Sequence, residues 1–308
     1  MLELSKKILT EYKIRKSKKQ KMEFLNFLKA QAIELGYDSQ IDESWAIVKN
    51  RNLIVGDIDK ADIICTAHYD TCATMPLPNL ITPLNIFFVI LYQVLLLVIV
   101  LALAMMVQAA LYFLSGGVLN SLLIFAFSLL FFCYVLIAGV ANKNNYNDNT
   151  SGVITLVEIM ASLKENKQEV AFIFFDNEEK GLLGSSAISQ KYKSELEGKL
   201  IINFDCVSDG DNIFVLYNKF SRKDAALMSA FDSSFNLDNN KKLLSSTSAF
   251  YPSDQASFSK NKTIAVAALK HNKIIGYYMD RIHTNKDVVF DEQNIEVIRG
   301  AIVDFVMK

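Results

Sequence analysis

The middle of this 308-residue chain contains a long stretch without a charged side chain. Between Thr71 and Asn142 there is no Asp, Glu, Lys or Arg. Two apolar runs lie inside this stretch, Ile86 to Leu114 and Val118 to Ala138. Each is as long as the roughly 20 residues that a helix needs to cross the hydrocarbon core of a bilayer. We therefore expect two membrane-spanning helices and the lipid bilayer as a partner.

A pair of helices buried in a soluble core is the alternative for these two runs. Core helices of this length normally carry one polar face, and neither run has one. The uncharged turn Ser115-Gly116-Gly117 joins the runs into a hairpin, so both ends emerge on one side. Lysines are frequent before and after the hairpin. Because positive residues stay in the cytoplasm, we expect a two-span protein of the cell membrane with both flanks cytoplasmic.

The overall composition restricts the partners and the compartment. A formal net charge of -1 gives no reason to expect nucleic acid, because phosphate binding requires clustered, excess Lys and Arg. The four cysteines show no paired spacing, so we expect free thiols in a reducing compartment. The first residues lack the apolar core of a secretory signal, which agrees with a cytoplasmic location. The sequence does not specify an oligomeric state.

The two flanks are predicted to form a single α/β domain that the hairpin interrupts. Short, nearly continuous apolar runs are typical of strands buried on both faces of a largely parallel sheet. Four such runs occur: Ile63 to Ala67, Val170 to Phe175, Leu200 to Phe204 and Ile264 to Leu269. Amphipathic helical spacing lies around them, from Leu25 to a stop at Gly36, from Val153 to Met160 and from Ile295 to Phe305.

Alternating strands and helices predict a three-layer α/β sandwich with a mostly parallel central sheet. The chain then divides into three segments. Residues 1–80 form the first part of the domain, residues 81–141 form the transmembrane hairpin, and residues 142–308 form the second part.

Side chains that bind metals follow three of the predicted strands. His68 and Asp70 follow the first strand, Glu178 and Glu179 follow the second, and Asp205 follows the third. Ligand sites of open α/β sheets lie at the carboxyl ends of the strands, so we expect these groups to lie together. Imidazole and carboxylate form a zinc-type ligand set.

Each of these signals also has a structural interpretation. His68 and Asp70 share one face of a strand, so the carboxylate can orient the imidazole, although such pairs also occur on surfaces. Glu178 and Glu179 point in different directions at a strand end, so one can bind metal while the other acts as a general base. Asp148 shortly precedes a predicted helix, and its position also suits a helix cap.

Taken in order, these segments resemble a known family. The matching segments are Ala67 to Thr71, Asp148 to Gly152, Phe174 to Ser185, Asn203 to Asp205 and Ile282 to Thr284. The chain resembles the co-catalytic zinc exopeptidases that include bacterial leucyl aminopeptidases, glutamate carboxypeptidase and glutaminyl cyclases (metallopeptidase family twenty-eight). The resemblance covers most of the chain outside the hairpin and implies the fold of that family.

The resemblance also implies a centre with two Zn²⁺ ions. His68 and Asp205 are expected to hold one ion, Glu179 and His283 the other, and Asp148 to bridge the two. By the same resemblance, Glu178 is the general base and Asp70 orients His68. The implied activity is that of a membrane-anchored exopeptidase acting on peptides, with an aminopeptidase as the first choice.

Several alternatives remain open at this point. The same fold also serves carboxypeptidases, glutaminyl cyclases and metal-free scaffolds, and the hairpin either selects the substrate or only tethers the enzyme. This chain has Gln255 where the family often has His, which affects contacts with the substrate. We expect the rival histidine, His271, to be a solvated surface residue because it lies between Lys270 and Asn272.

Overall fold

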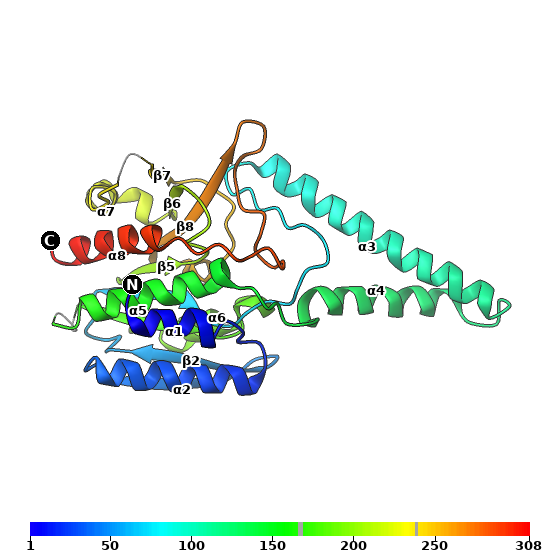
Figure 1. The fold of residues 1–308 in the computed structure, drawn as a ribbon, viewed down its shortest axis with the longest axis horizontal. Helices are drawn as coiled ribbons and strands as arrows, with labels where there is room; N and C mark the ends of the chain where they lie inside the picture. Colours follow the sequence, from blue (N-terminus) through cyan, green and yellow to red (C-terminus); the bar gives the residue numbers. More distant parts are fainter. Residues whose placement is uncertain (166–168, 238–239) are drawn as a thin grey trace.

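The computed structural model describes residues 1–165, 169–237 and 240–308, apart from the side chain of Ile137. An α/β body contains the sheet with helices packed around it, and two long helices project from this body (Figure 1). The projecting helices, α3 (Ile86–Leu114) and α4 (Ser121–Ala138), belong to the uncharged stretch.

One mixed sheet runs through the body in the order β1-β2-β4-β3-β5-β8-β6-β7, and β9 pairs with β8. The strands are β1 (Ser39–Trp45), β2 (Lys49–Val55), β3 (Ile63–His68), β4 (Val170–Phe175), β5 (Leu200–Phe204), β6 (Asn212–Tyr217), β7 (Lys242–Ser246), β8 (Lys262–Asn272) and β9 (Gly276–Tyr278). All four predicted strands are present. The prediction of a mostly parallel sheet holds for the central strands β4, β3, β5 and β8.

The outer strands make the sheet mixed. β1 pairs with β2, β2 with β4, and β6 with β8 in the antiparallel sense. Only a short turn joins β1 to β2, and so short a connection can join only antiparallel neighbours. β3, from the first flank, lies between β4 and β5 of the second flank. One sheet is therefore built from both sides of the uncharged stretch.

Alternate residues of the central strands pack into cores on opposite faces of the sheet. In β4, Phe172 and Phe174 belong to one core, while Ile173 and Phe175 belong to the other. The first core is covered by α1 (Glu3–Glu11), α2 (Lys18–Glu34), α5 (Gly152–Ser162), α7 (Ala225–Asp232) and α8 (Glu292–Val306). The opposite face is covered in part by α6 (Leu183–Lys191). This layering explains why the strands read as continuous apolar runs.

Among the described residues, α3 is the one helix long and apolar enough to cross a membrane, with a mean hydropathy of 3.1. α4 is shorter than the predicted run, because the Asn120 side chain accepts the N–H groups of Leu122 and Leu123 and fixes the helix start at Ser121. Its 18 residues extend about 27 Å, short of the roughly 30 Å of a bilayer core. The predicted second span is therefore not supported, and the first rests on length and composition.

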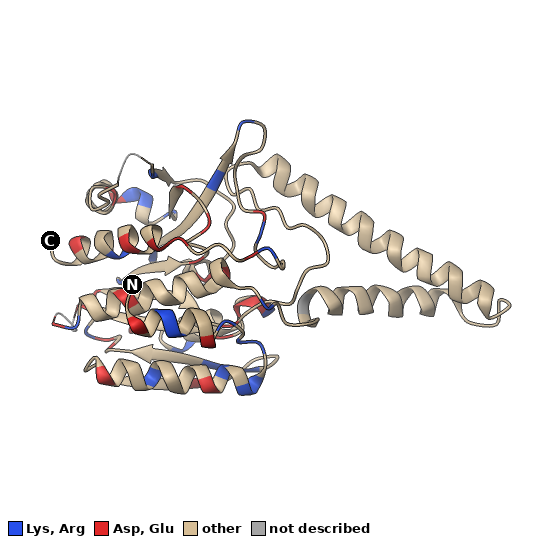
Figure 2. Cartoon of the chain, in the orientation of Figure 1, with Lys and Arg blue, Asp and Glu red and all other residues tan. Residues whose placement is uncertain are grey.

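The alternative of two helices buried in a soluble core is wrong. α3 and α4 pack against each other, yet α3 buries only Val100 and Ala104. Large apolar side chains are exposed along both helices, including Phe113 and Leu122 at 79% and 73%. No Lys, Arg, Asp or Glu lies on either helix, whereas these residues are spread over the body (Figure 2).

Candidate metal centre

The parallel strands β3, β4 and β5 deliver their terminal residues to one edge of the sheet. His68 is the last residue of β3, Glu178 and Glu179 begin the turn after β4, and Asp205 directly follows β5. Asp148 arrives in the segment before α5, and the loop after β9 adds the remaining predicted ligand, His283. The structure thus brings all five predicted metal ligands together.

Asp148 lies between the two histidines. Its Oδ1 is 3.3 Å from Nε2 of His68, and its Oδ2 is 3.0 Å from Nε2 of His283. A second carboxylate accompanies each imidazole: Asp205 Oδ1 lies 3.6 Å from His68 Nε2, and Glu179 Oε2 lies 3.5 Å from His283 Nε2. One group of possible ligands contains His68 and Asp205, and the other contains Glu179 and His283. Both groups share the carboxylate of Asp148, an arrangement suited to two neighbouring cations.

Two buried oxygens in these groups test whether a metal fits. Glu179 Oε1 and Asp205 Oδ1 have no hydrogen-bond partner among the described residues. A buried carboxylate oxygen without a partner is costly, and a divalent cation between the ligands would satisfy both atoms. The donor set of imidazole nitrogens and carboxylate oxygens is one that zinc prefers. The residues present therefore fit zinc.

The segment that carries Asp148 is fastened to the end of β5. Asn149 Nδ2 donates to the carbonyl of Phe204 at 2.9 Å. A Cβ added to Gly152 would lie 2.4 Å from the same carbonyl oxygen, so only glycine allows this close approach. The α5 cap residue, Ser151, makes no side-chain capping bond, and Asp148 faces the histidines. The helix-cap interpretation of Asp148 is therefore wrong.

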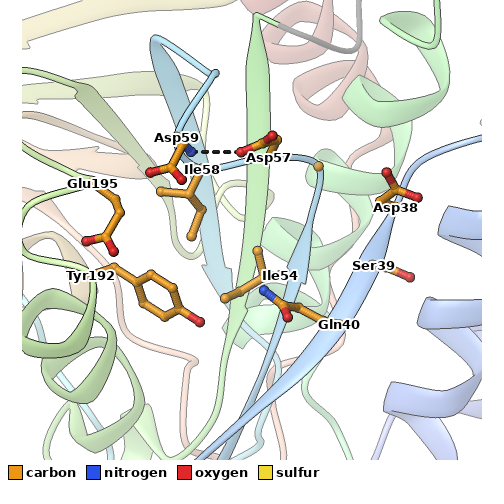
Figure 3. Close-up of a pocket in the computed structure, with 10 residues that line it drawn as sticks. Asp38, Ser39, Gln40, Ile54, Asp57, Ile58, Asp59, Tyr192 and Glu195 are labelled. Atoms are coloured by element: carbon orange, nitrogen blue, oxygen red, sulfur yellow. Dashed lines mark hydrogen bonds between the residues drawn. The ribbon is translucent and has the colours of Figure 1, made fainter.

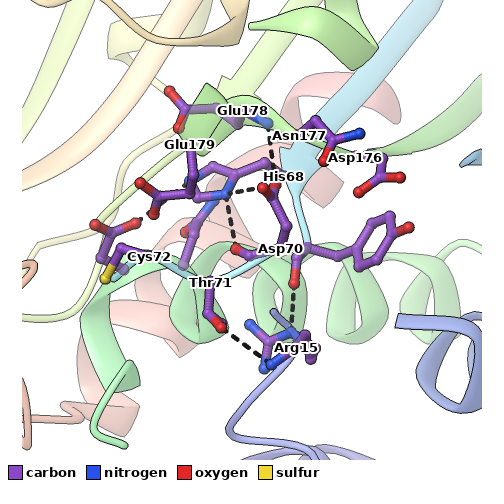
Figure 4. Close-up of polar contacts among 12 residues, drawn as sticks. Arg15, His68, Asp70, Thr71, Cys72, Asp176, Asn177, Glu178 and Glu179 are labelled. Carbon is purple, nitrogen blue, oxygen red and sulfur yellow. Dashed lines mark hydrogen bonds and ion pairs between the residues drawn. The ribbon is translucent and has the colours of Figure 1, made fainter. Parts of the chain in front are cut away.

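Asp70 faces the second nitrogen of His68, as Figure 4 shows. His68 Nδ1 lies 3.2 Å from the Asp70 carbonyl oxygen and 3.7 Å from its Oδ1. The Asp70 carboxylate also accepts the N–H of Glu178 at 3.0 Å and lies 3.8 Å from Lys21 Nζ. Burial opposes ionisation of Asp70, but Lys21 and His68 outweigh it and lower its pKa. An ionised carboxylate behind His68 favours the tautomer that presents Nε2 as a ligand.

Glu178 faces the same pocket as the two histidines. Burial raises the pKa of Glu178 well above its ordinary value, His68 opposes this shift, and Glu179 adds to it. A carboxylate whose pKa is raised in this way holds a proton more readily than a free carboxylate, as a general base requires. Asp176, two residues earlier, instead pairs with Lys21 and takes no part in the metal groups.

A pocket of about 190 Å³ opens over the ligands. His68, Asp148, Glu178, Asp205 and His283 line its polar side. Its apolar side is lined by Leu80, Ile81, Val89, Phe250 and Ile282. The space equals that of about six waters in the liquid, enough for one side chain but small for a folded protein segment.

A second hollow, of about 310 Å³, lies at the opposite end of the sheet. Figure 3 shows its lining residues, which come mainly from the start of β1, the end of β2 and the loop that enters β3. Its carboxylates are those of Asp38, Asp57, Asp59 and Glu195, and no histidine or cysteine is among the described residues that line it. This hollow therefore lacks the mixed ligand set found at the carboxyl ends of the strands.

No sequence pattern points to Arg15, which lies fully buried beneath the ligands (Figure 4). Its guanidinium donates to the carbonyls of Tyr69 and Tyr12 and lies 3.1 Å from Thr150 Oγ1. Its backbone N–H donates to Thr71 Oγ1 at 3.0 Å. Burial lowers the pKa of Arg15 to about 10, so it stays charged at neutral pH. Arg15 therefore joins the end of β3 to the Asp148 segment and supplies a buried positive charge.

Cys72, predicted only to be a free thiol, lies beside the metal groups. Its Sγ lies with the Asp148, Glu179 and His283 ligand atoms. Burial, together with Glu179, raises the pKa of this thiol well above its ordinary value. Cys72 lies within reach of the same cation as Glu179 and His283. Its position four residues after His68 is the sequence signal that could have found it.

Asp287, which the sequence patterns also miss, holds the backbone beside the shared ligand. Its two carboxylate oxygens accept the N–H groups of Asn147 and Asp148, at 2.8 and 3.0 Å. Asn147 Oδ1 in turn accepts the N–H of Ser208 at 2.7 Å. The position of Asp148 is therefore fixed by contacts from two distant segments of the chain.

Gln255 and His271 both lie outside the pocket. Gln255 accepts from Asn203 Nδ2 at 3.0 Å and donates to the Tyr251 carbonyl, so it supports β5. His271 is exposed on β8 and packs against Tyr277, with ring centroids 4.7 Å apart. The prediction that His271 is a surface residue is confirmed.

Imidazole and carboxylate groups gathered at the carboxyl ends of parallel strands are typical of metal-dependent α/β enzymes. Residues 139–304 match the sequence profile of peptidase family M28. The chain therefore belongs to this peptidase family. A comparison with curated protein sequences finds no match.

Solved structures share the fold at low sequence identity. The LapA aminopeptidase of Legionella pneumophila is 15% identical with a TM-score of 0.60, covering 99% of this chain and 68% of that chain. The glutaminyl cyclase of Porphyromonas gingivalis is 16% identical with a TM-score of 0.64, covering 99% and 95%. A Zn-dependent exopeptidase of Parabacteroides distasonis is 12% identical with a TM-score of 0.62, covering 98% and 94%.

Proposed function

We propose that this chain is a membrane-anchored, zinc-dependent aminopeptidase that removes N-terminal residues from peptides. The observation that carries the proposal is the position of Asp148, which directs one oxygen to His68 and the other to His283. A carboxylate placed in this way suits two cations held side by side. Membership of a peptidase family and structural likeness to a Zn-dependent exopeptidase support hydrolysis of a peptide bond.

The donor groups divide into two sets. His68 and Asp205 would hold one zinc ion, Glu179 and His283 the other, and Asp148 both. When bound, zinc would polarise the scissile carbonyl and lower the pKa of water.

The chain's own residues supply the proton transfer. Glu178, at the pocket wall, takes a proton from the attacking water and delivers it to the nitrogen of the leaving amine. Its raised pKa suits a group that must hold the proton between these two steps. Asp70 keeps the His68 ring oriented from behind, through contacts to Nδ1.

The lining of the pocket favours an aminopeptidase over a carboxypeptidase. A carboxypeptidase benefits from a cationic side chain that binds the terminal carboxylate, and Arg suits this role best. No Lys or Arg is among the described residues that line this pocket. The small volume of the pocket supports trimming at a chain end.

We also infer where the enzyme lies in the cell. α3 anchors it in the cell membrane, with the catalytic body on the cytoplasmic side. The exposed apolar surface of α3 supports the anchor, and the lysine-rich flanks support the orientation. α4 returns the chain to the body.

Detergent-purified protein tests the activity, through its zinc content and a panel of peptides with free or acetylated N-termini. We expect two zinc ions per chain and cleavage of the free peptides only. Glu178→Gln should keep the zinc and reduce turnover about 10²- to 10⁴-fold. The matched control Glu195→Gln lies in the distant hollow and should leave turnover unchanged.

Other results would redirect the proposal. Cleavage of acetylated peptides would indicate a carboxypeptidase. Cyclisation of N-terminal glutamine without peptide cleavage would indicate a glutaminyl cyclase. A zinc-free protein without turnover would indicate a scaffold.

A further inference from the structure

The apolar helix α3 reaches the catalytic pocket. Two residues of its first turns, Val89 and Gln93, line the pocket together with the metal ligands. They are four positions apart and so share one face of the helix. Val89 is half-buried, whereas Gln93 is exposed, which places Gln93 at the mouth. The proposed anchor therefore also forms part of the wall over the reacting groups.

The start of α3 is held in place by the segment that leads into it. Met75 N–H donates to the carbonyl of His283 at 2.7 Å, and Asn79 Nδ2 donates to the Ile282 carbonyl at 3.3 Å. Ile81 and Met279 exchange two backbone hydrogen bonds of 2.9 Å. The entry to α3 is therefore bound to the same loop that carries His283.

The residues next to the helix start add two further links. Asn85 caps α3 and donates through Nδ2 to the Ile275 carbonyl at 3.2 Å. The Phe250 N–H donates to the Pro83 carbonyl at 2.9 Å. Phe250 itself lines the pocket. The hydrogen bond to Pro83 therefore connects the Phe250 part of the apolar lining to the start of α3. The helix start is thus fixed relative to the metal ligands.

The length of α3 allows it to serve as both anchor and wall. Its 29 residues extend about 43 Å, against roughly 30 Å for the bilayer core. The excess corresponds to more than two helical turns. Because Val89 and Gln93 lie near the start of α3, they can stand at the catalytic body while the remainder of the helix lies in lipid.

We propose that Val89 and Gln93 determine which peptides the enzyme accepts, an inference that rests on the proposed aminopeptidase activity. The substrate's N-terminal side chain is apolar and packs against Val89. This follows from the lining, whose described residues include no charged group apart from the predicted metal ligands and Glu178. The amide of Gln93, at the mouth, forms a hydrogen bond with the peptide backbone of the next residue. The insert is then a specificity element and not only a tether.

Paired substitutions at two positions of α3 test this role. Val89→Phe fills the pocket and Val89→Ala enlarges it. Val94 lies on the same helix, is 51% exposed and does not line the pocket, so Val94→Phe and Val94→Ala are matched controls. The readout is the ratio of kcat/KM for phenylalanyl and alanyl amides, measured on detergent-purified protein with its zinc content determined.

We expect Val89→Phe to lower the phenylalanyl-to-alanyl ratio about tenfold or more, because an apolar pocket discriminates by roughly that factor per methylene-sized change. Val89→Ala should raise the ratio, and both Val94 variants should match the unmodified enzyme. Gln93→Ala should lower kcat/KM about three- to tenfold for tripeptides, while amino-acid amides, which lack the next residue, are unaffected.

The outcomes separate this inference from the activity on which it rests. An unmodified enzyme that cleaves free peptides, with the same ratio in the Val89 and Val94 variants, would overturn the inference alone. An unmodified enzyme with bound zinc but no cleavage would overturn both. Val89→Ala removes only small groups, so it provides the answer even if Val89→Phe does not fold.

Discussion

Nε2 of His283 lies 3.0 Å from Oδ2 of Asp148, while the other oxygen of this carboxylate faces His68. The three residues come from separate parts of the chain, and the backbone N–H of Asp148 is itself held by Asp287. Asp148 is therefore the one group common to both predicted sets of metal ligands. Its removal should affect both sets together.

Asp148→Ala should disrupt the whole centre. We expect this variant to bind at most one zinc ion and to lose detectable peptide cleavage, because each cation loses a ligand and the bridge between them disappears. Elemental analysis of the purified protein and a peptide assay measure the two effects. Asp211, with a side chain 82% exposed, provides the control Asp211→Ala, which should keep both zinc ions. Two zinc ions in Asp148→Ala would refute the bridging role.

Arg15→Met should lower the stability of the fold, because Arg15 is buried between the end of β3 and the Asp148 segment. The substitution leaves the carboxylates of Asp70 and Asp148 without this positive charge and leaves the Tyr69 carbonyl without its donor. Breaking one side of such a buried arrangement costs about 3–5 kcal/mol, which lowers the melting temperature by roughly 6–20 °C.

Thermal melting of the purified protein measures this effect. The exposed Arg222 provides the control Arg222→Met, which should melt within a few degrees of the unmodified protein. Arg15→Lys keeps the charge but cannot reproduce the several hydrogen bonds of the guanidinium. Its melting temperature should therefore lie between those of Arg15→Met and Arg222→Met. Equal melting of Arg15→Met and Arg222→Met would contradict the role given to Arg15.

The central strands could be predicted from the sequence because both faces of the sheet are covered. β4 is apolar at every position since alternate residues enter different cores. β1 could not be found in this way, because it lies at the edge of the sheet and carries polar residues such as Gln40 and Glu43. Its existence depends on pairing with β2, which a local pattern does not reveal.

The candidate ligands at strand ends could also be anticipated, because parallel neighbours end at one edge of the sheet. His68, Glu179 and Asp205 follow from this rule. His283 does not, since it lies on a loop with a left-handed backbone (φ 61°). The family resemblance points to it, and the polar neighbours of His271 speak against that rival. Arg15 left no signal, because it is recognised by carbonyl groups that meet only in the folded chain.

The stability of the metal-free protein should depend on pH. Burial raises the pKa of Glu179 to about 8, from an ordinary value of 4.5. Burial opposes protonation of His283, but Glu179 and Asp148 outweigh it and raise its pKa to about 10, from 6.5. Both groups hold protons more tightly in the folded state than in the unfolded state. The free energy of unfolding must therefore fall as pH rises between the ordinary and the raised values.

Zinc binding should reverse this trend, because it requires the deprotonated ligands that are costly in the metal-free protein. We expect the melting temperature of chelator-treated protein to decrease as the pH is raised from about 6 to about 8. The increase in melting temperature on adding zinc should be larger at the higher pH. Asp148→Ala is the control and should show little gain at either pH. A gain that is equal at both pH values in the unmodified protein would argue against metal binding by this cluster.

The turn between α3 and α4 should lie outside the cell if the helices cross the bilayer with the body in the cytoplasm. Val118, 85% exposed in this turn, can be changed to cysteine and treated in intact cells with a maleimide that does not cross membranes. The comparison is Ser194→Cys, exposed on the body. Of the native cysteines, Cys65, Cys72 and Cys206 are buried, and the exposed Cys133 is replaced by serine beforehand.

We expect labelling of Val118→Cys in intact cells, and labelling of Ser194→Cys only after the membrane is opened. Labelling of both only after opening would place the turn on the same side as the body, so that neither α3 nor α4 would cross the bilayer. Labelling of Ser194→Cys alone in intact cells would invert the orientation, because the lysine-rich flanks would then lie outside. The pattern of labelling therefore decides the number of spans and the side of the catalytic body together, which the length of α3 and the composition of the flanks only predict.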